Sequence, residues 1–145
     1  MNKLKWCFEQ KRGLEFIEPN ANLSKEYIEE ANDTLENMFV AKGKWRVIIA
    51  YYACYNALYS VLMKAGVKSE IHDCTIALMS ILPDFEKEDI ELIEALKRDR
   101  IDAQYYLKDV ELKDESKIKA FVLKCKTLLN NLDIDEFRTI LREEI

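Results

Sequence analysis

The chain has 145 residues, a formal net charge of −5 and a hydrophobic fraction of 49%. This length fits one domain with a full hydrophobic core, and so few glycines (three) and prolines (two) favour long regular elements joined by short connections. The negative charge excludes non-specific attraction to nucleic acid but leaves room for a local basic site. We therefore treat residues 1–145 as a single domain.

The first helices are predicted from turn signals and apolar spacing. Residues 1–22 form an N-terminal docking segment, in which 3–17 include a short helix and Pro19 lies in a turn. Ser24 is the predicted N-cap of a helix that runs to about residue 41 and is closed by Gly43. Its apolar residues recur at intervals of three and four, which gives one buried stripe: Tyr27, Ile28, Ala31, Leu35, Met38 and Phe39.

The stretch from Trp45 to Ala65 is apolar on most of its circumference. Its residues that are neither apolar nor tyrosine fall within an arc of roughly 80° on a helix: Arg46, Asn56, Ser60 and Lys64. Other helices must surround such a helix, so we expect it at the centre of an all-helical domain. Its polar residues favour a core helix over a membrane span, and we expect no membrane association.

Three further helices and a short one complete the chain. Gly66 ends the central helix, and Ser69 caps the next, which Pro83 stops. The acidic stretch 84–91 opens a fourth helix that continues to about Leu107.

Asp114 starts a fifth helix, through Leu132, and Asp133 with Glu136 forms a capping box for the last one. No repeat and no strand signal longer than a few residues is present. The sequence therefore predicts an all-α fold, an up-and-down bundle of about five to six helices.

The four cysteines lie far apart and include no CxxC pair: Cys7, Cys54, Cys74 and Cys125. Cys54 and Cys125 fall in apolar helical runs, where cysteine acts as a small hydrophobe. No signal peptide is visible at the start. We therefore expect reduced thiols and a cytoplasmic location.

The fourth helix carries a basic residue on its packing seam. Arg100 occupies a seam position whose neighbours on the same stripe are apolar, namely Ile93, Leu96, Ala103 and Leu107. A guanidinium there requires a polar partner. Asn56 and Ser60 on the central helix are candidates, Gln104 lies one turn away on the same side, and Asp99 is a weaker option. The alternative places Arg100 at the rim of the seam, with a packed stem and a solvated head.

Three stretches carry a resemblance to a known family. They are RDRIDAQYY (98–106), YYACYNALY (51–59) and KWCFEQKRGLEFIEPNANLSKEYIEEA (5–31). Together they resemble the HEPN domain, the helical family named for nucleotide binding in higher eukaryotes and prokaryotes, and the likeness extends over nearly the whole chain. The resemblance implies a helical bundle and a homodimer that brings two fourth helices together.

Many members of that family are metal-independent ribonucleases, often toxins paired with a nucleotidyltransferase antitoxin. Their signature is an arginine followed, after four to six residues, by a histidine, a pair thought to cut RNA with the ribose 2′-hydroxyl as nucleophile. Here Tyr105 stands at the histidine position, counted from either Arg98 or Arg100. A phenol with a pKa near 10 is a poor general base but can donate a hydrogen bond or stack on a base.

We therefore expect a HEPN-like module that binds a nucleotide, RNA or a partner protein, without ribonuclease activity, cofactor or metal. The alternative is an endoribonuclease toxin in which Arg100 stabilises the phosphorane charge and Tyr105 acts as acid or orienting group. The nucleotidyltransferase-type protein is the expected partner. Arg100, Gln104, Asn56, Arg98, Asp102 and Tyr105 are the candidate binding residues.

Simpler structural roles compete for several of these residues. Arg98, Asp102 and Tyr105 share an outer helix face, where Arg98 and Asp102 can form a surface salt bridge. His72, the only histidine, matches no zinc spacing and is predicted to be a surface residue in a first helical turn. The tyrosines at 51, 52, 55 and 59 are typical of core and interface rings.

Overall fold

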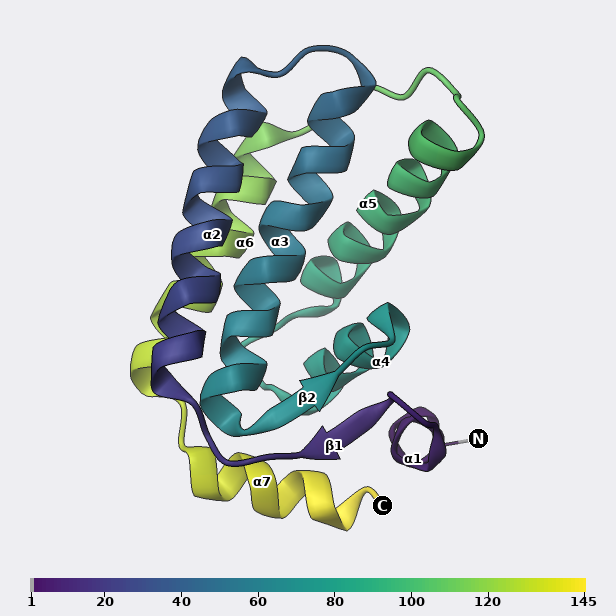
Figure 1. The fold of residues 1–145 in the computed structure, drawn as a ribbon. Helices are drawn as coiled ribbons and strands as arrows, with labels where there is room; N and C mark the ends of the chain where they lie inside the picture. The colour runs from purple at the N-terminus through teal and green to yellow at the C-terminus, as the bar shows by residue number, and fades with distance from the viewer. Residues whose placement is uncertain (1) are drawn as a thin grey trace.

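The computed structural model describes residues 2–145, which are helical apart from one short pair of strands (Figure 1). The elements are α1 (Lys3–Glu9), β1 (Leu14–Phe16), α2 (Ala21–Val40), α3 (Lys44–Ala65), β2 (Val67–Ser69), α4 (His72–Ala77), the 3₁₀ helix η1 (Leu78–Ile81), α5 (Lys87–Tyr105), α6 (Glu115–Asn131) and α7 (Ile134–Glu143). The all-α prediction is confirmed, while the described residues form seven α-helices rather than five to six.

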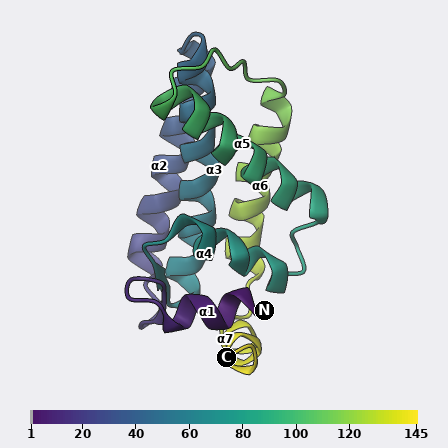
Figure 2. The same ribbon diagram turned by 90° about the vertical axis from the view of Figure 1, so that its right-hand side faces the viewer.

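Four long helices form the bundle and alternate in direction. Helices α2 and α3 lie side by side with α6 behind them (Figure 1), and α5 crosses α3 obliquely (Figure 2). The central position predicted for the stretch 45–65 is correct, because α3 contacts α2, α5, α6, α4 and α7 and most of its residues are buried. Within residues 2–145, no helix combines the length and the apolar character needed to cross a membrane.

The short elements gather at one end of this bundle, where both ends of the chain also lie (Figure 1). Strands β1 and β2 pair antiparallel, with Leu14 opposite Ser69 and Phe16 opposite Val67. Helix α1 packs against α4, and α7 lies across the same end (Figure 2). This end region positions α4 against the side of α3, where the candidate site is found.

Several predicted boundaries are wrong for identifiable reasons. Asn20, not Ser24, caps α2, because its side chain accepts a hydrogen bond from the Leu23 N–H, whereas Ser24 is buried and donates to the Ser60 carbonyl at 2.7 Å. Ser69 caps no helix because it pairs in β2. The helix predicted between Ser69 and Pro83 is divided into α4 and η1.

The expectation of reduced thiols is wrong for two cysteines. Cys7 in α1 and Cys74 in α4 form a disulfide across a sequence separation of 67. Cys54 and Cys125 are free and buried, as their apolar surroundings predict. Burial raises the pKa of both of these thiols, so they are inert core residues.

Candidate functional site

Arg100 is buried in the seam between α5 and α3. Its side chain is 7% exposed, which rules out the solvated position at the rim. Its Nη1 donates to the Tyr52 hydroxyl at 3.3 Å and to the Gln104 side-chain oxygen at 3.2 Å. Gln104 is therefore a partner, as its spacing of four predicts. The arginine has the polar neighbours that a buried cation requires.

Tyrosine rings form the rest of the environment of this guanidinium. Its Cζ lies 4.9 Å from the ring centroid of Tyr51, 5.6 Å from that of Tyr52 and 5.8 Å from that of Tyr105. Aromatic faces attract a cation, most strongly where water is excluded. Among residues 2–145, no carboxylate oxygen lies within 4.0 Å of its nitrogens, and the buried Nε has no hydrogen-bond partner. The positive charge is thus held by π faces and neutral oxygens rather than by an acid.

The two partners predicted on the central helix do not bind Arg100. Ser60 is fully buried, and its hydroxyl donates within its own helix to the Ala57 carbonyl at 2.5 Å. Asn56 is half-buried and faces a neighbouring groove. Tyrosines 51 and 52 take the place expected for these residues because their longer side chains reach across the helix–helix gap.

The three residues expected on the outer face of α5 are not one group. Asp102 pairs with Lys108 at 3.7 Å, and the predicted salt bridge from Arg98 to Asp102 is absent from the described part of the chain. Arg98 is exposed. Tyr105, the last residue of α5, is 65% exposed, yet its ring approaches Arg100 rather than Arg98. Only Tyr105 of this set belongs to the site around Arg100.

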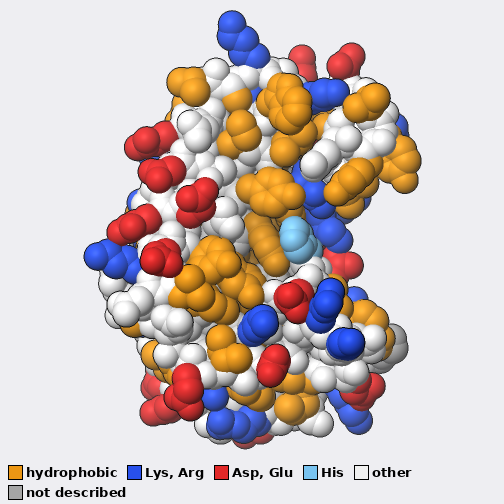
Figure 3. All heavy atoms as spheres, in the orientation of Figure 1, with side chains coloured by type: hydrophobic (Ala, Val, Ile, Leu, Met, Phe, Trp, Pro, Cys, Tyr) orange, Lys and Arg blue, Asp and Glu red, His pale blue; other side chains and the backbone are white. Residues whose placement is uncertain are grey.

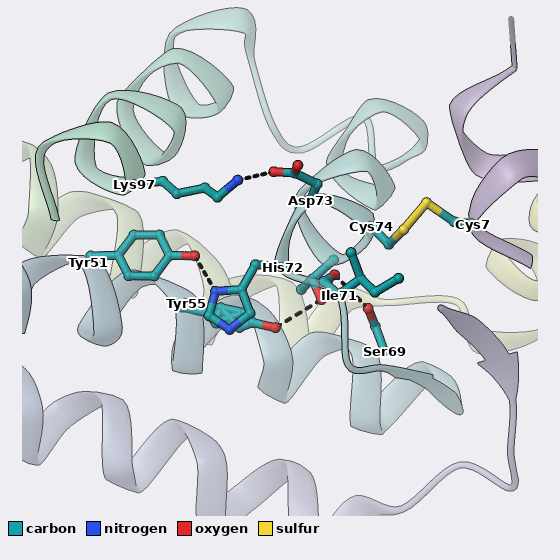
Figure 4. Close-up of polar contacts among 10 residues, drawn as sticks. Cys7, Tyr51, Tyr55, Ser69, Ile71, His72, Asp73, Cys74 and Lys97 are labelled. Carbon is teal, nitrogen blue, oxygen red and sulfur yellow. Dashed lines mark hydrogen bonds and ion pairs between the residues drawn. A yellow bond between two sulfur atoms is a disulfide. The ribbon is translucent and has the colours of Figure 1, made fainter. Parts of the chain in front are cut away.

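His72 is the member of the site that the sequence interpretation missed. It begins α4, but it is half-buried rather than on the open surface. Its Nδ1 lies 2.7 Å from the hydroxyl of Tyr51, and its ring stacks on Tyr55 with centroids 4.1 Å apart (Figure 4). The same Tyr51 ring contacts the Arg100 guanidinium, so one tyrosine joins the histidine to the arginine.

An ion pair beside the imidazole joins α4 to α5. Lys97 binds the Asp73 carboxylate (Figure 4) and holds the pKa of that carboxyl below its usual range. Burial lowers the pKa of His72, and the charges of Arg100 and Lys97 lower it further, while Asp73 opposes them. At neutral pH the imidazole is therefore neutral.

The phenols of the site also keep their protons. Burial raises the pKa of Tyr51 well above its ordinary value and that of Tyr55 to about 12. Tyr55 shares a hydrogen bond with the Thr75 hydroxyl at 3.1 Å, and Tyr59 donates to the Ser69 carbonyl at 2.9 Å. These contacts fix the rings, so the phenols offer rigid aromatic faces and neutral donors and do not act as a general base.

A groove beside this cluster opens to solvent. It has a volume of about 480 Å³, and its principal lining residues are Tyr27, Tyr52, Tyr55, Tyr59, Asn56 and His72; we call it the tyrosine groove. Lys68 and Glu70, of opposite charge, also line it. Figure 3 shows the imidazole in a hollow of the surface, with hydrophobic side chains on one side and basic ones on the other. The size and the flat aromatic lining suit a planar ligand.

Residues 2–145 hold no group of three or more His, Cys, Asp or Glu side chains arranged to bind a metal ion. A scan against models of known protein families finds no match for the chain, and a search among curated proteins finds none either.

Proposed function

We propose that the protein is a HEPN-like helical module that binds a nucleotide or single-stranded RNA, acts as a homodimer and does not cleave RNA. The observation that carries this proposal is the buried Arg100 guanidinium, which has aromatic and amide neighbours but no acidic partner among the described residues. A cation kept in this way favours an anionic ligand such as a phosphate. The adjoining tyrosine groove supplies faces on which bases stack.

The protonation states of the phenols support the proposal that the protein does not cleave RNA. Tyr105 stands where the family that the chain resembles has its histidine, and a phenol is a poor base at neutral pH. Tyr51 and Tyr55 are held protonated by burial. Binding therefore fits the chemistry of these side chains better than hydrolysis does.

Binding is tested with a labelled single-stranded RNA and with the variants Arg100→Ala and Arg98→Ala. Loss of a charged hydrogen-bond donor weakens binding by about tenfold or more. The slope of log affinity against log salt concentration is expected to fall by about one. The exposed Arg98, two residues away on the same helix, is the matched control and is expected to change affinity little. A melting curve for each variant separates lost binding from lost folding. Equal affinity for folded Arg100→Ala and wild type would contradict the proposal.

The dimer is tested by the mass of the protein in solution. The residues directly after α5 are large, apolar and exposed, with Tyr106 at 68% and Leu107 at 73%, and exposed apolar surface of this kind supports an interface. Light scattering after size-exclusion chromatography is expected to give twice the chain mass. A monomer whose RNA binding does not depend on Arg100 would remove the main supports of the proposal.

An endoribonuclease toxin is the second candidate, and one observation favours it. The fold brings the only histidine of the chain, His72, to the tyrosine that contacts Arg100. An RNA-cleavage assay with wild type, Arg100→Ala, Tyr105→Phe and His72→Ala separates the candidates. Cleavage that disappears in these variants favours the toxin, for which a nucleotidyltransferase-type protein is the proposed partner. Intact RNA with retained binding favours the binding module.

A cytoplasmic location belongs to the same proposal. The disulfide between Cys7 and Cys74 is unusual for that compartment, although intracellular proteins of hyperthermophiles contain such bonds. The oxidation state of these two cysteines in protein isolated under thiol-trapping conditions is the observation that bears on this point.

A further inference from the structure

We propose that His72 presents a neutral Nε2–H donor to the edge of a nucleobase bound in the tyrosine groove, so that this groove is the base subsite and Arg100 belongs to the phosphate side. The inference rests on the nucleotide-binding function proposed above and specifies which part of the ligand each half of the site receives. It assigns a role to a residue outside the arginine–tyrosine pair of α5.

The hydrogen-bond geometry of Tyr51 fixes the tautomer of the imidazole. Tyr51 is fully buried, and within the described residues its hydroxyl has one hydrogen-bond partner, the Nδ1 of His72 at 2.7 Å. A buried phenol that retains its proton must donate it. If Nδ1 carried a hydrogen, the phenol hydrogen would have no acceptor. Nδ1 is therefore the acceptor, and the neutral ring carries its proton on Nε2.

The other ring nitrogen is left available to a ligand. Among residues 2–145, Nε2 has no protein hydrogen-bond partner, and it is not among the buried unpaired atoms, so it reaches solvent. Stacking on Tyr55, with an interplanar angle of 19°, fixes the plane in which this N–H points. Figure 4 shows the second ring nitrogen on the side of the ring away from the Tyr51 hydroxyl, and His72 lines the groove, so the donor is available to a ligand bound there.

The groove has the components of a base site rather than of a phosphate site. Tyr52 and Tyr59 offer half-buried ring faces, and the Asn56 amide offers both a donor and an acceptor. Nucleobases carry ring nitrogens and carbonyl oxygens that accept hydrogen bonds at their edges, and their planes stack on tyrosine. Lys68 and Glu70 both line the groove and offset each other's charge, so it offers a phosphate no net positive charge, whereas Arg100 and Lys97 act on His72 but are not among the lining residues.

The first test measures the tautomer in the free protein. His72 is the only histidine, so ¹⁵N-histidine labelling gives one pair of ring resonances. A long-range ¹H–¹⁵N spectrum near neutral pH is expected to show a bare Nδ1 and a protonated Nε2. Tyr51→Phe removes the donor and is expected to allow the other tautomer. A protonated Nδ1 in wild type would overturn the inference and leave the binding proposal untouched.

The second test compares two amide substitutions with a ten-nucleotide single-stranded RNA and with an abasic ribose-phosphate chain of the same length. The amide nitrogen of His72→Gln reaches the Nε2 position, whereas that of His72→Asn reaches only Nδ1, and both variants lose the stack on Tyr55. Gln is expected to bind RNA within about twofold of wild type, and Asn about three- to tenfold more weakly, as for one lost hydrogen bond.

The abasic chain separates the two subsites. Wild type is expected to bind it more weakly than RNA, with no difference between the Gln and Asn variants, while Arg100→Ala still lowers the remaining affinity. RNA binding that is equal in both amide variants, or equal for RNA and the abasic chain, would overturn the base subsite alone. Failure of wild type to bind either probe would overturn the proposed function together with it.

Discussion

At the scale of single residues, the site is an arrangement of neutral side chains around one cation. Arg100 is stabilised by the faces of Tyr51, Tyr52 and Tyr105, and its charge in turn disfavours a second positive charge on the nearby imidazole. His72 must therefore stay neutral for the cluster to be stable. That requirement connects the protonation of one side chain to the stability of the whole fold.

We predict that His72 makes stability fall as the pH drops below about 6.5, the ordinary pKa of histidine. The folded state holds the pKa of His72 below that value, because of burial and the charges of Arg100 and Lys97, which outweigh Asp73. Well above pH 6.5 the imidazole is neutral in both the folded and the unfolded state, so His72 does not lower the free energy of unfolding. Below it the unfolded chain takes up a proton first, so the free energy of unfolding falls until the folded-state pKa is passed.

Melting temperatures measured between pH 8 and pH 5 check this prediction. His72→Gln removes the only histidine, so its profile is expected to be flatter in this window. The effect of the acids on stability can be separated from that of His72. The pKa values of Asp73 and Asp114 are lowered in the folded state, so their contributions to stability are lost only as the pH falls below the usual aspartate range near pH 4. Profiles that run parallel for wild type and variant would show that His72 is not held neutral.

The sequence places Arg100 on the packing seam but leaves open whether its head is buried, and it does not identify most of its neighbours. The apolar spacing that places Arg100 on the seam and the spacing of four to Gln104 are local helical patterns, so both can be read without a structure. Leu107, also predicted on the seam, lies beyond the end of α5 and is 73% exposed. The contacts with Tyr51 and Tyr52 depend on how α5 crosses α3. His72 was missed because its approach to Tyr51 depends on the short β2–α4 connection, whose conformation no periodic pattern indicates.

At the scale of elements, the long helices are predictable because their end signals are local. Asp114 and Asp133 cap α6 and α7 as predicted, by accepting the Lys117 and Glu136 N–H groups, although the return bond of the predicted Asp133–Glu136 capping box is not among the hydrogen bonds of the described residues. Gly66 ends α3 with a φ of 77°, where an added Cβ would approach within 2.6 Å of the Ile17 carbonyl oxygen. Strands β1 and β2 have three residues each, too few for an alternating pattern to be recognised.

Arg138 of α7 holds the end region together. Its Nη1 donates to the carbonyls of Ile17 at 3.0 Å, Ala65 at 3.0 Å and Gly66 at 2.7 Å, and its guanidinium lies 5.0 Å from the Phe16 ring centroid. These carbonyls belong to the end of α3 and to the chain beside β1 and β2. One side chain thus satisfies backbone acceptors from distant parts of the sequence.

We predict that Arg138→Met lowers the free energy of unfolding by about 2 to 4 kcal/mol, because half-buried carbonyls lose a charged donor. Arg142→Met is the matched control, since Arg142 also lies over Phe16, at 5.2 Å, but makes no side-chain hydrogen bond within residues 2–145. Its loss is expected to be under about 1 kcal/mol. Urea unfolding measures the loss in the free energy of unfolding for both variants. Equal losses would show that the hydrogen bonds of Arg138 contribute little.

At the scale of the whole molecule, the chain consists of a four-helix bundle and an end region built from its first, middle and last parts. Helix α1 and strand β1 come from the start, β2 and α4 from the middle, and α7 from the end of the chain (Figure 1). Helix α4 carries both His72 and Cys74, so the disulfide to Cys7 connects the N-terminal helix to the element that completes the site. No local pattern indicates a pairing over 67 residues, and for this reason the sequence favoured free thiols.

We predict that reduction of this disulfide lowers the stability of the whole protein. Closing a loop of 67 residues restricts the unfolded chain, and the chain-entropy treatment sets the stabilisation at about 4 kcal/mol. Thermal unfolding with and without reductant is expected to differ for wild type and to coincide for the Cys7→Ser, Cys74→Ser double variant.

Alkylation of the denatured protein counts the free thiols independently. Two cysteines are expected to react before reduction and four after it, because Cys54 and Cys125 are free. Four reactive thiols in the unreduced protein would contradict the bond, and a melting curve insensitive to reductant would show that α1 contributes little to the stability of the bundle.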